Sequence, residues 1–170
     1  VYSFCMCPGG FVVPASTGPE ETVVNGMSPA NRGSRWANSG LVVELHPEDI
    51  PATSIKVEDP ASPLALMQWC EAFEHKSYLA ANRSLRAPAQ RMTDFVARRH
   101  SSTLPSSSYT MGLTSSDLHE WMPDFITRRL SAGFRAFDRT TSGFLTGEAQ
   151  LIGVESRTSS PVRIPRDRMT

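Results

Sequence analysis

Two cysteines close to the start of the chain, Cys5 and Cys7, are the first residues whose type and spacing suggest chemistry. In a strand, residues two apart share a face and lie about 6.6–6.8 Å from each other, so a disulfide between them would be strained. No basic residue adjoins either thiol to lower its pKa. Small apolar residues of a buried strand are therefore the favoured interpretation, and a reactive thiol is the alternative.

The sequence contains too few suitably spaced metal-binding side chains for a metal centre. A structural zinc site takes about four Cys or His ligands. Besides Cys5 and Cys7 the chain offers Cys70 and four isolated histidines, His46, His75, His100 and His119. We expect no metal site, and we expect the histidines at the surface or in loops rather than as catalytic bases.

Two Gly- and Asn-rich segments are candidates for contact with a ligand. Gly9 and Gly10 follow Pro8 and mark a sharp turn, which either closes a hairpin or lets the backbone approach a ligand closely. The stretch from Asn25 to Asn38 is too polar and Gly-rich for regular structure, and it is a candidate binding loop.

Arginine is the basic residue of this chain, supplying 15 of its 17 Lys and Arg side chains. The segment from Arg157 to Arg163 places Thr158, Ser159 and Ser160 between two guanidinium groups, which is a pattern that can hold an anionic substrate or cofactor oxygens. Arg91 is a further candidate for such a site. The alternative is a surface turn and solvated faces.

Composition excludes several classes of protein. The formal net charge is zero, which gives no global argument for nucleic-acid or membrane binding. No apolar run approaches the ~18 residues of a membrane span, and three cysteines fit a reducing cytoplasm. The chain contains no G-x-G pair, P-loop, G-x-S-x-G, H-E-x-x-H or C-x-x-C motif.

Hydrophobic patterning predicts an α+β fold with a mostly antiparallel sheet and a helical insertion. The strand-rich part covers 1–58, the helical part 60–140 and the returning strands 148–165. Within these parts we predict strands at 2–7, 11–15, 22–26, 40–46, 149–156 and 161–164. Helices are predicted at 62–81, 91–98, in a short turn at 118–122, and from Pro123 onward, where Ile126, Leu130, Phe134 and Phe137 form a stripe.

Six segments, in order along the chain, resemble the C-terminal half of a family of poorly characterised bacterial FAD-dependent dehydrogenases. They are YSFCMCPGG (Tyr2–Gly10), VVNGMS (Val23–Ser28), ANSGLVV (Ala37–Val43), APAQR (Ala87–Arg91), DFVARR (Asp94–Arg99) and IGVESRTSSPVRI (Ile152–Ile164). Gly40 stands where the resemblance leads us to expect Ala.

The resemblance implies that residues 1–170 are one truncated cap or substrate domain, inactive alone, of a cytoplasmic FAD-dependent oxidoreductase. An FAD-binding Rossmann domain of the same polypeptide would hold most of the FAD, with NAD(P)H as a further electron partner. This domain would cover the flavin and shape the site of an unknown small-molecule substrate. The flavin-side positions are then Cys5, Cys7, Gly9, Gly10, Asn25, Asn38 and Ser39, and the substrate-side positions are Arg91, Arg157, Ser159, Ser160 and Arg163.

Two other functions remain open at this point. The first is a stand-alone small-molecule binding module without flavin. The second is a thiol-dependent enzyme that uses Cys5 or Cys7.

Overall fold

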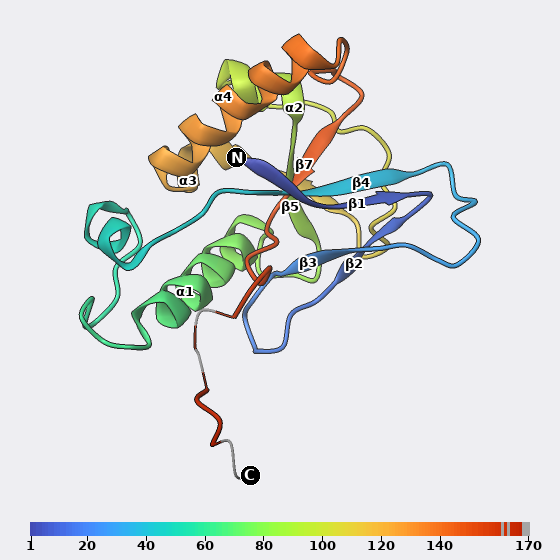
Figure 1. The fold of residues 1–170 in the computed structure, drawn as a ribbon. Helices are drawn as coiled ribbons and strands as arrows, with labels where there is room; N and C mark the ends of the chain where they lie inside the picture. The colour runs from blue at the N-terminus through green and yellow to red at the C-terminus, as the bar shows by residue number, and fades with distance from the viewer. Residues whose placement is uncertain (161, 163, 168–170) are drawn as a thin grey trace.

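The computed structural model describes residues 1–160, 162 and 164–167, and it shows the expected α+β fold with small sheets and helices (Figure 1). Among these residues no helix combines the length and the apolarity needed to cross a membrane. The elements, in chain order, are β1 (Tyr2–Pro8), β2 (Phe11–Pro14), β3 (Val24–Met27), β4 (Ala37–Val42), the 3-10 helix η1 (Pro47–Ala52), α1 (Ala65–Ala80), β5 (Ala87–Arg91), α2 (Met92–Ala97), β6 (Leu113–Ser115), α3 (Leu118–Trp121), α4 (Asp124–Thr140) and β7 (Gln150–Ile152).

The N-terminal strands form two antiparallel ribbons, β1 with β4 and β2 with β3. The turn at Gly9–Gly10 therefore joins two ribbons and does not close a hairpin between its own flanking strands. Gly9 has φ +62°, and a Cβ there would lie 1.9 Å from the carbonyl oxygen of Arg32. The close approach at this turn is thus to the chain's own backbone, which only glycine permits.

The ribbons take up part of the segment predicted as a binding loop. β3 includes Asn25 and β4 begins at Ala37, so the loop itself covers only 28–36. β4 also begins three residues earlier than the strand predicted at 40–46, because pairing with β1 continues through polar residues such as Asn38.

A three-stranded sheet in the order β6-β5-β7 lies behind the ribbons, and two of its strands were not predicted. Four of the five β5 residues are buried, without the alternation that marks a strand with one solvated face. β6 has only three residues, and its pairing with β5 is parallel, unlike the other pairs. The strand predicted at 149–156 is present only as β7, and the one predicted at 161–164 includes positions outside the described residues.

Helix α4 supplies the centre of the core through the predicted stripe. Ile126, Leu130 and Phe134 are buried at intervals of four residues, and the ring of Phe134 meets Phe95 of α2 at 6.1 Å. For α1 the helical spacing of the sequence predicts a stripe of Leu66, Cys70 and Phe73. Phe73 is buried as this stripe requires, whereas Leu66 and Cys70 are only half-buried and Trp69 is buried in their place.

One histidine does not lie at the surface as expected. His119 is only 6% exposed, and its Nδ1 lies 2.7 Å from Nε2 of the fully buried Gln90 in β5. Gln90 also donates to the carbonyl oxygen of Arg99. The side chain thus serves a structural hydrogen-bond network that joins α3 and β5.

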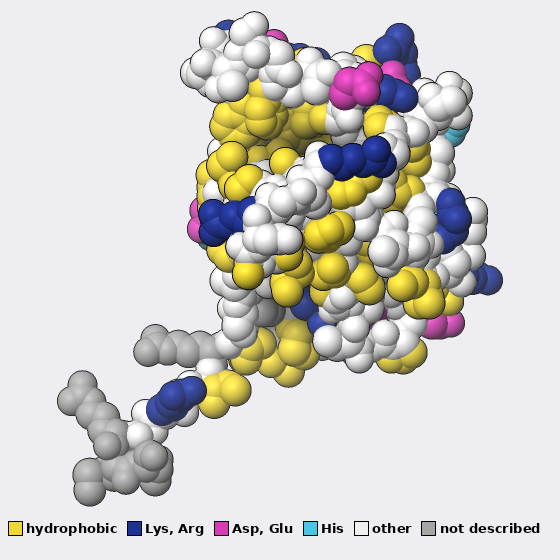
Figure 2. All heavy atoms as spheres, turned by 90° about the vertical axis from the view of Figure 1, so that its right-hand side faces the viewer, with side chains coloured by type: hydrophobic (Ala, Val, Ile, Leu, Met, Phe, Trp, Pro, Cys, Tyr) yellow, Lys and Arg dark blue, Asp and Glu magenta, His cyan; other side chains and the backbone are white. Residues whose placement is uncertain are grey.

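Apolar side chains remain exposed on the N-terminal ribbons, and two of them, Tyr2 and Met6, also line the cavity described below. Tyr2, Phe4 and Met6 alternate along β1 and are 54%, 51% and 77% exposed, with Phe11 and Met27 exposed nearby. Figure 2 shows one face of the molecule, on which yellow apolar side chains are extensive and surround a hollow. Apolar surface of this extent is uncommon on a part of a protein that faces only water.

Replacing Phe134 by Ala tests the assignment of the core. Because Phe134 is completely buried, we expect the free energy of unfolding to fall by about 3–5 kcal/mol in urea denaturation. Leu85→Ala is the control, since Leu85 is 76% exposed and should change stability by no more than about 0.5 kcal/mol. Equal effects of the two substitutions would contradict the packing described.

Candidate functional site

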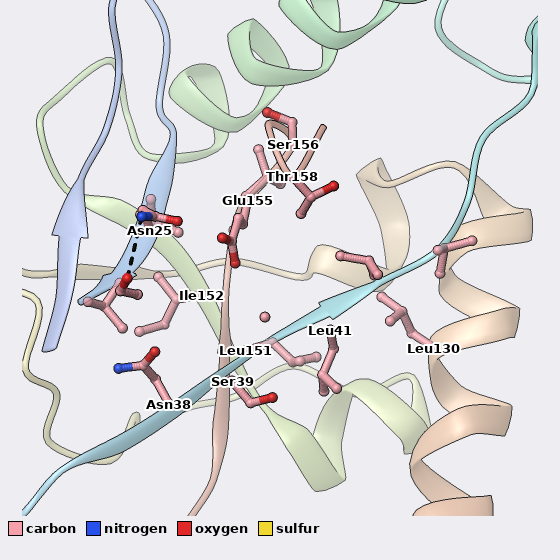
Figure 3. Close-up of a pocket in the computed structure, with 18 of the residues that line it drawn as sticks. Asn25, Asn38, Ser39, Leu41, Leu130, Leu151, Ile152, Glu155, Ser156 and Thr158 are labelled. Carbon is pink, nitrogen blue, oxygen red and sulfur yellow. Dashed lines mark hydrogen bonds between the residues drawn. The ribbon is translucent and has the colours of Figure 1, made fainter. Parts of the chain in front are cut away.

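A cavity of about 830 Å³ lies between β4, the segment 149–156 and the helices α1 and α4. Its size is within the range of small-molecule sites, roughly 300–1,000 Å³. Figure 3 shows apolar side chains on its walls, among them Leu41 of β4, Leu130 of α4, and Leu151 and Ile152 of β7. Strand and helix side chains that are far apart in sequence therefore meet around one space.

Polar groups enter this cavity from β3 and β4. Asn25, Asn38 and Ser39 all line it, as the resemblance leads us to expect of flavin-side residues. The Nδ2 atom of Asn38 is buried without a hydrogen-bond partner among the described residues. A Cβ on Gly26 would lie 2.3 Å from Oδ1 of Asn38, so the glycine makes room for this amide.

Glu155 is the most conspicuous polar residue of the cavity, and sequence reasoning missed it. Figure 3 shows its carboxylate pointing into the middle of the space. The side chain is half-buried, and the structure gives it no hydrogen-bond or ion-pair partner among the described residues. Burial raises the pKa of this carboxyl above its ordinary value. An unpaired carboxyl with a raised pKa in a cavity is a feature of functional sites.

Gly40 of β4 makes the position of Glu155 possible. A Cβ on residue 40 would lie 2.6 Å from Oε2 of Glu155 and 3.3 Å from Sγ of Cys5. The glycine found where the resemblance suggests Ala therefore lets a carboxylate lie directly against the strand. The glycine at position 40 and the glutamate at position 155 can both be read in the sequence, but only the fold shows that they lie together.

The other flavin-side candidates, Cys5, Cys7, Gly9 and Gly10, are not among the residues that line the cavity. The described cysteines are free thiols, and Cys7 is buried. Burial, with a smaller contribution from Cys5, raises the pKa of Cys7, which disfavours the reactive thiolate. The hypothesis of a thiol-dependent enzyme gains no support from this geometry.

Arg157 is held by protein groups. Its Nε donates to Oε1 of Glu74 at 2.9 Å, and its Nη2 donates both to Oε2 of Glu74 and to Oε2 of Glu21. A further hydrogen bond joins Nη1 to the hydroxyl of Thr17. The hydrogen bonds that Arg157 donates to Glu74 raise the pKa of Arg157, so the guanidinium is always charged. Glu74 is only 1% exposed, whereas the Arg157 side chain is 36% exposed, so a buried carboxylate is paired here with a partly exposed guanidinium.

The remaining substrate-side candidates are divided between several places. Ser159 and Ser160 line the cavity. Arg91 lies at the β5–α2 junction, where it donates to the carbonyl oxygens of Gly147 and Thr103. Arg163 lies outside the described residues. Substrate binding by these residues stays a prediction.

The residues of the cavity suit one part of an FAD molecule better than the other. The flat flavin ring has polar edges that amide and hydroxyl groups can meet, and Asn25, Asn38 and Ser39 supply such groups among the lining residues. The phosphates, by contrast, need a Gly-rich loop at a helix N-terminus, and this sequence has no G-x-G pair. The chain thus fits the ring and not the phosphate part.

The fold and the cavity define an α+β domain with a ligand-sized space, in a sequence without a G-x-G phosphate-binding motif. The chain belongs to the family described as FAD-dependent protein, C-terminal domain-like, which matches residues 1–158. It is therefore a flavoprotein-associated domain. An uncharacterized protein of Clostridium beijerinckii is 38% identical over 169 residues, which cover 98% of this chain and 30% of that protein. The chain thus spans less than a third of the relative's length.

Removing the charge of Glu155 should change stability in a pH-dependent manner. Since the native state holds the carboxyl proton more tightly than the unfolded chain, stability decreases as pH rises through the raised pKa. A glutamine side chain does not ionise, so Glu155→Gln avoids this loss of stability at high pH. We therefore expect the stability of the variant relative to wild type to be greater near about pH 8 than near about pH 4. Urea denaturation at both pH values measures the difference, and a pH-independent difference would contradict the assignment.

Breaking the ion pair of Glu74 should be costly. Arg157→Met leaves the buried carboxylate of Glu74 without its cationic partner and, among the described residues, with only the hydroxyl of Ser156 donating to it, so we expect a loss of about 3 kcal/mol in the free energy of unfolding. Adding Glu74→Gln should recover part of that loss. Arg128→Met is the control, because Arg128 and its partner Asp124 are both exposed and the pair contributes less than about 1 kcal/mol. Similar losses for Arg157→Met and Arg128→Met would refute the structural role of Arg157.

Proposed function

We propose that this chain is the part of an FAD-dependent oxidoreductase that covers the flavin and shapes the substrate site. The observation that carries the proposal is the family match over residues 1–158. The cavity supports it, since its apolar side chains can pack against a ring and its Asn and Ser side chains can orient it.

On this proposal another part of the same polypeptide holds the phosphates and the adenosine of FAD. The missing phosphate-binding motif supports this division, and so does the length of the relative, of which the chain covers 30%. The exposed apolar side chains Tyr2, Phe4 and Met6 offer a surface for contact with that part. Residues 1–19 include no charged side chain, which favours such a dry contact. The chain alone is then inactive.

Each residue of the cavity has a defined task under this proposal. The flavin supplies the redox chemistry when it is bound, with NAD(P)H as a further electron partner. Asn25, Asn38 and Ser39 orient the edge of the ring through hydrogen bonds, and the unpartnered Nδ2 of Asn38 is the donor with most to gain. Leu130 and Leu151 keep water away from the reacting atoms.

A purified longer polypeptide that includes this segment tests the proposal. We expect flavin absorbance from the longer protein and none from residues 1–170 alone. Asn38→Leu in the longer protein should weaken flavin binding about tenfold, equivalent to roughly 1.4 kcal/mol, because the ring loses a hydrogen bond. Asn31→Leu, in the exposed loop 28–36, should bind flavin like wild type.

The negative outcomes are distinct. A colourless longer protein that takes up no added FAD would rule out the flavoenzyme and favour a stand-alone binding module, whose cavity would then hold another small molecule. Flavin binding that Asn38→Leu leaves unchanged would keep the flavoenzyme but remove the cavity from the flavin site.

A further inference from the structure

The charge of the cavity is one-sided. Among the lining residues that the structure describes, none is Lys, Arg or His, whereas three are glutamates. Glu44 and Glu148 are exposed, and Glu155 is half-buried. Arg157, the nearest basic residue in sequence, is committed to Glu74 and Glu21 and does not line the space.

An anionic ligand is therefore disfavoured here. A second negative charge beside the carboxylate of Glu155 would repel it, and no described cation of the cavity would offset that repulsion. Arg157 does not act as an anion-binding group of this cavity, since its guanidinium is ion-paired with two carboxylates outside it.

A cationic ligand, in contrast, meets an unpaired acceptor. The Glu155 carboxylate points into the cavity and lacks a partner among the described residues. Ionising a half-buried carboxyl is unfavourable unless an opposite charge or a donor accompanies it. A protonated amine supplies both, through a charge-assisted hydrogen bond.

The rest of the space suits a hydrocarbon. Leu41 of β4, Leu130 of α4, and Leu151 and Ile152 of β7 present apolar surface on the other sides of the carboxylate. Polar groups lie nearer to β3 and β4, at Asn25, Asn38 and Ser39. A ligand with one cationic end and an apolar body can therefore satisfy Glu155 and fill the apolar walls together.

We propose that this cavity binds a small molecule with an apolar body and a protonated amino group, with Glu155 as the counter-ion of the amine. That this molecule is the substrate of the flavin rests on the proposed function, whereas its binding does not. Glu155 selects the ligand by charge, and Gly40 provides the space in which the carboxylate lies.

Three probes with the same phenylethyl body separate charge from hydrophobicity: phenethylamine, phenethyl alcohol and hydrocinnamate. Isothermal titration calorimetry with the chain should show the amine binding about tenfold or more tightly than the carboxylate, with the alcohol between them. In Glu155→Gln the amine and the carboxylate should bind within about threefold of each other, since the charge that favours the amine has been removed. Retained binding of the alcohol shows that this variant is folded.

Glu148→Gln is the matched control, because it removes the same charge from an exposed lining residue. It should keep the amine preference of the wild type. A preference that Glu148→Gln loses and Glu155→Gln keeps would overturn the assignment of Glu155.

Three results would overturn the proposal itself: no binding of any probe to wild type, carboxylate binding as tight as amine binding, or an amine preference that survives in Glu155→Gln. These results leave the flavin measurement untouched. A longer protein that binds flavin without an amine preference removes this inference alone. An amine preference in a protein that binds no flavin removes the proposed function alone.

Discussion

The ion pair between the buried carboxylate of Glu74 in α1 and the guanidinium of Arg157 is the interaction on which the cavity depends. It fixes the chain after β7 to α1, and the contacts of Arg157 with Glu21 and Thr17 extend the same anchor to the loop before β3. Ser156 adds a hydrogen bond to Glu74. Because residues 156 and 157 are held against α1, the neighbouring Glu155 is directed into the cavity. The ion pair of Arg157 and Glu74 thereby positions the carboxylate of Glu155, which has no such partner among the described residues.

The charge of Glu155 is unfavourable for folding and useful for binding. Its burial raises its pKa, which means that the native state tolerates the ionised form poorly. Proteins keep such groups mainly where function needs them, since activity and stability often have conflicting demands. The cavity around it combines apolar walls with this inward carboxylate, and Gly40 of β4 lies against it. Selectivity for a cationic ligand follows from these features without any further group.

Sequence patterns predicted the long, periodic elements and failed for short or fully buried ones. The stripe of α4 at Ile126, Leu130 and Phe134 marks a helix with one buried face, and the structure confirms it. β5 has no alternation because it is buried within the molecule, and β6 is too short for a pattern. Asn25, Asn38 and Ser39 meet at the cavity, because β3 and β4 bring them there.

The site itself shows the limit of reading residues locally. Arg157 looks like an anion site because its partner Glu74 is 83 residues away and cannot be recognised by spacing. Glu155 lies within the segment IGVESRTSSPVRI, but a single glutamate after β7 gives no sign of a role in a cavity until the fold places Gly40 against it.

The most direct measurement is the titration of the Glu155 carboxyl by carbon-13 NMR, with the resonance assigned through Glu155→Gln. We expect a pKa above the ordinary range in the free chain, and a decrease in this pKa when phenethylamine is added, because the ammonium stabilises the ionised carboxylate. An ordinary pKa that the amine leaves unchanged would show that Glu155 is not a half-buried acceptor for a cationic ligand.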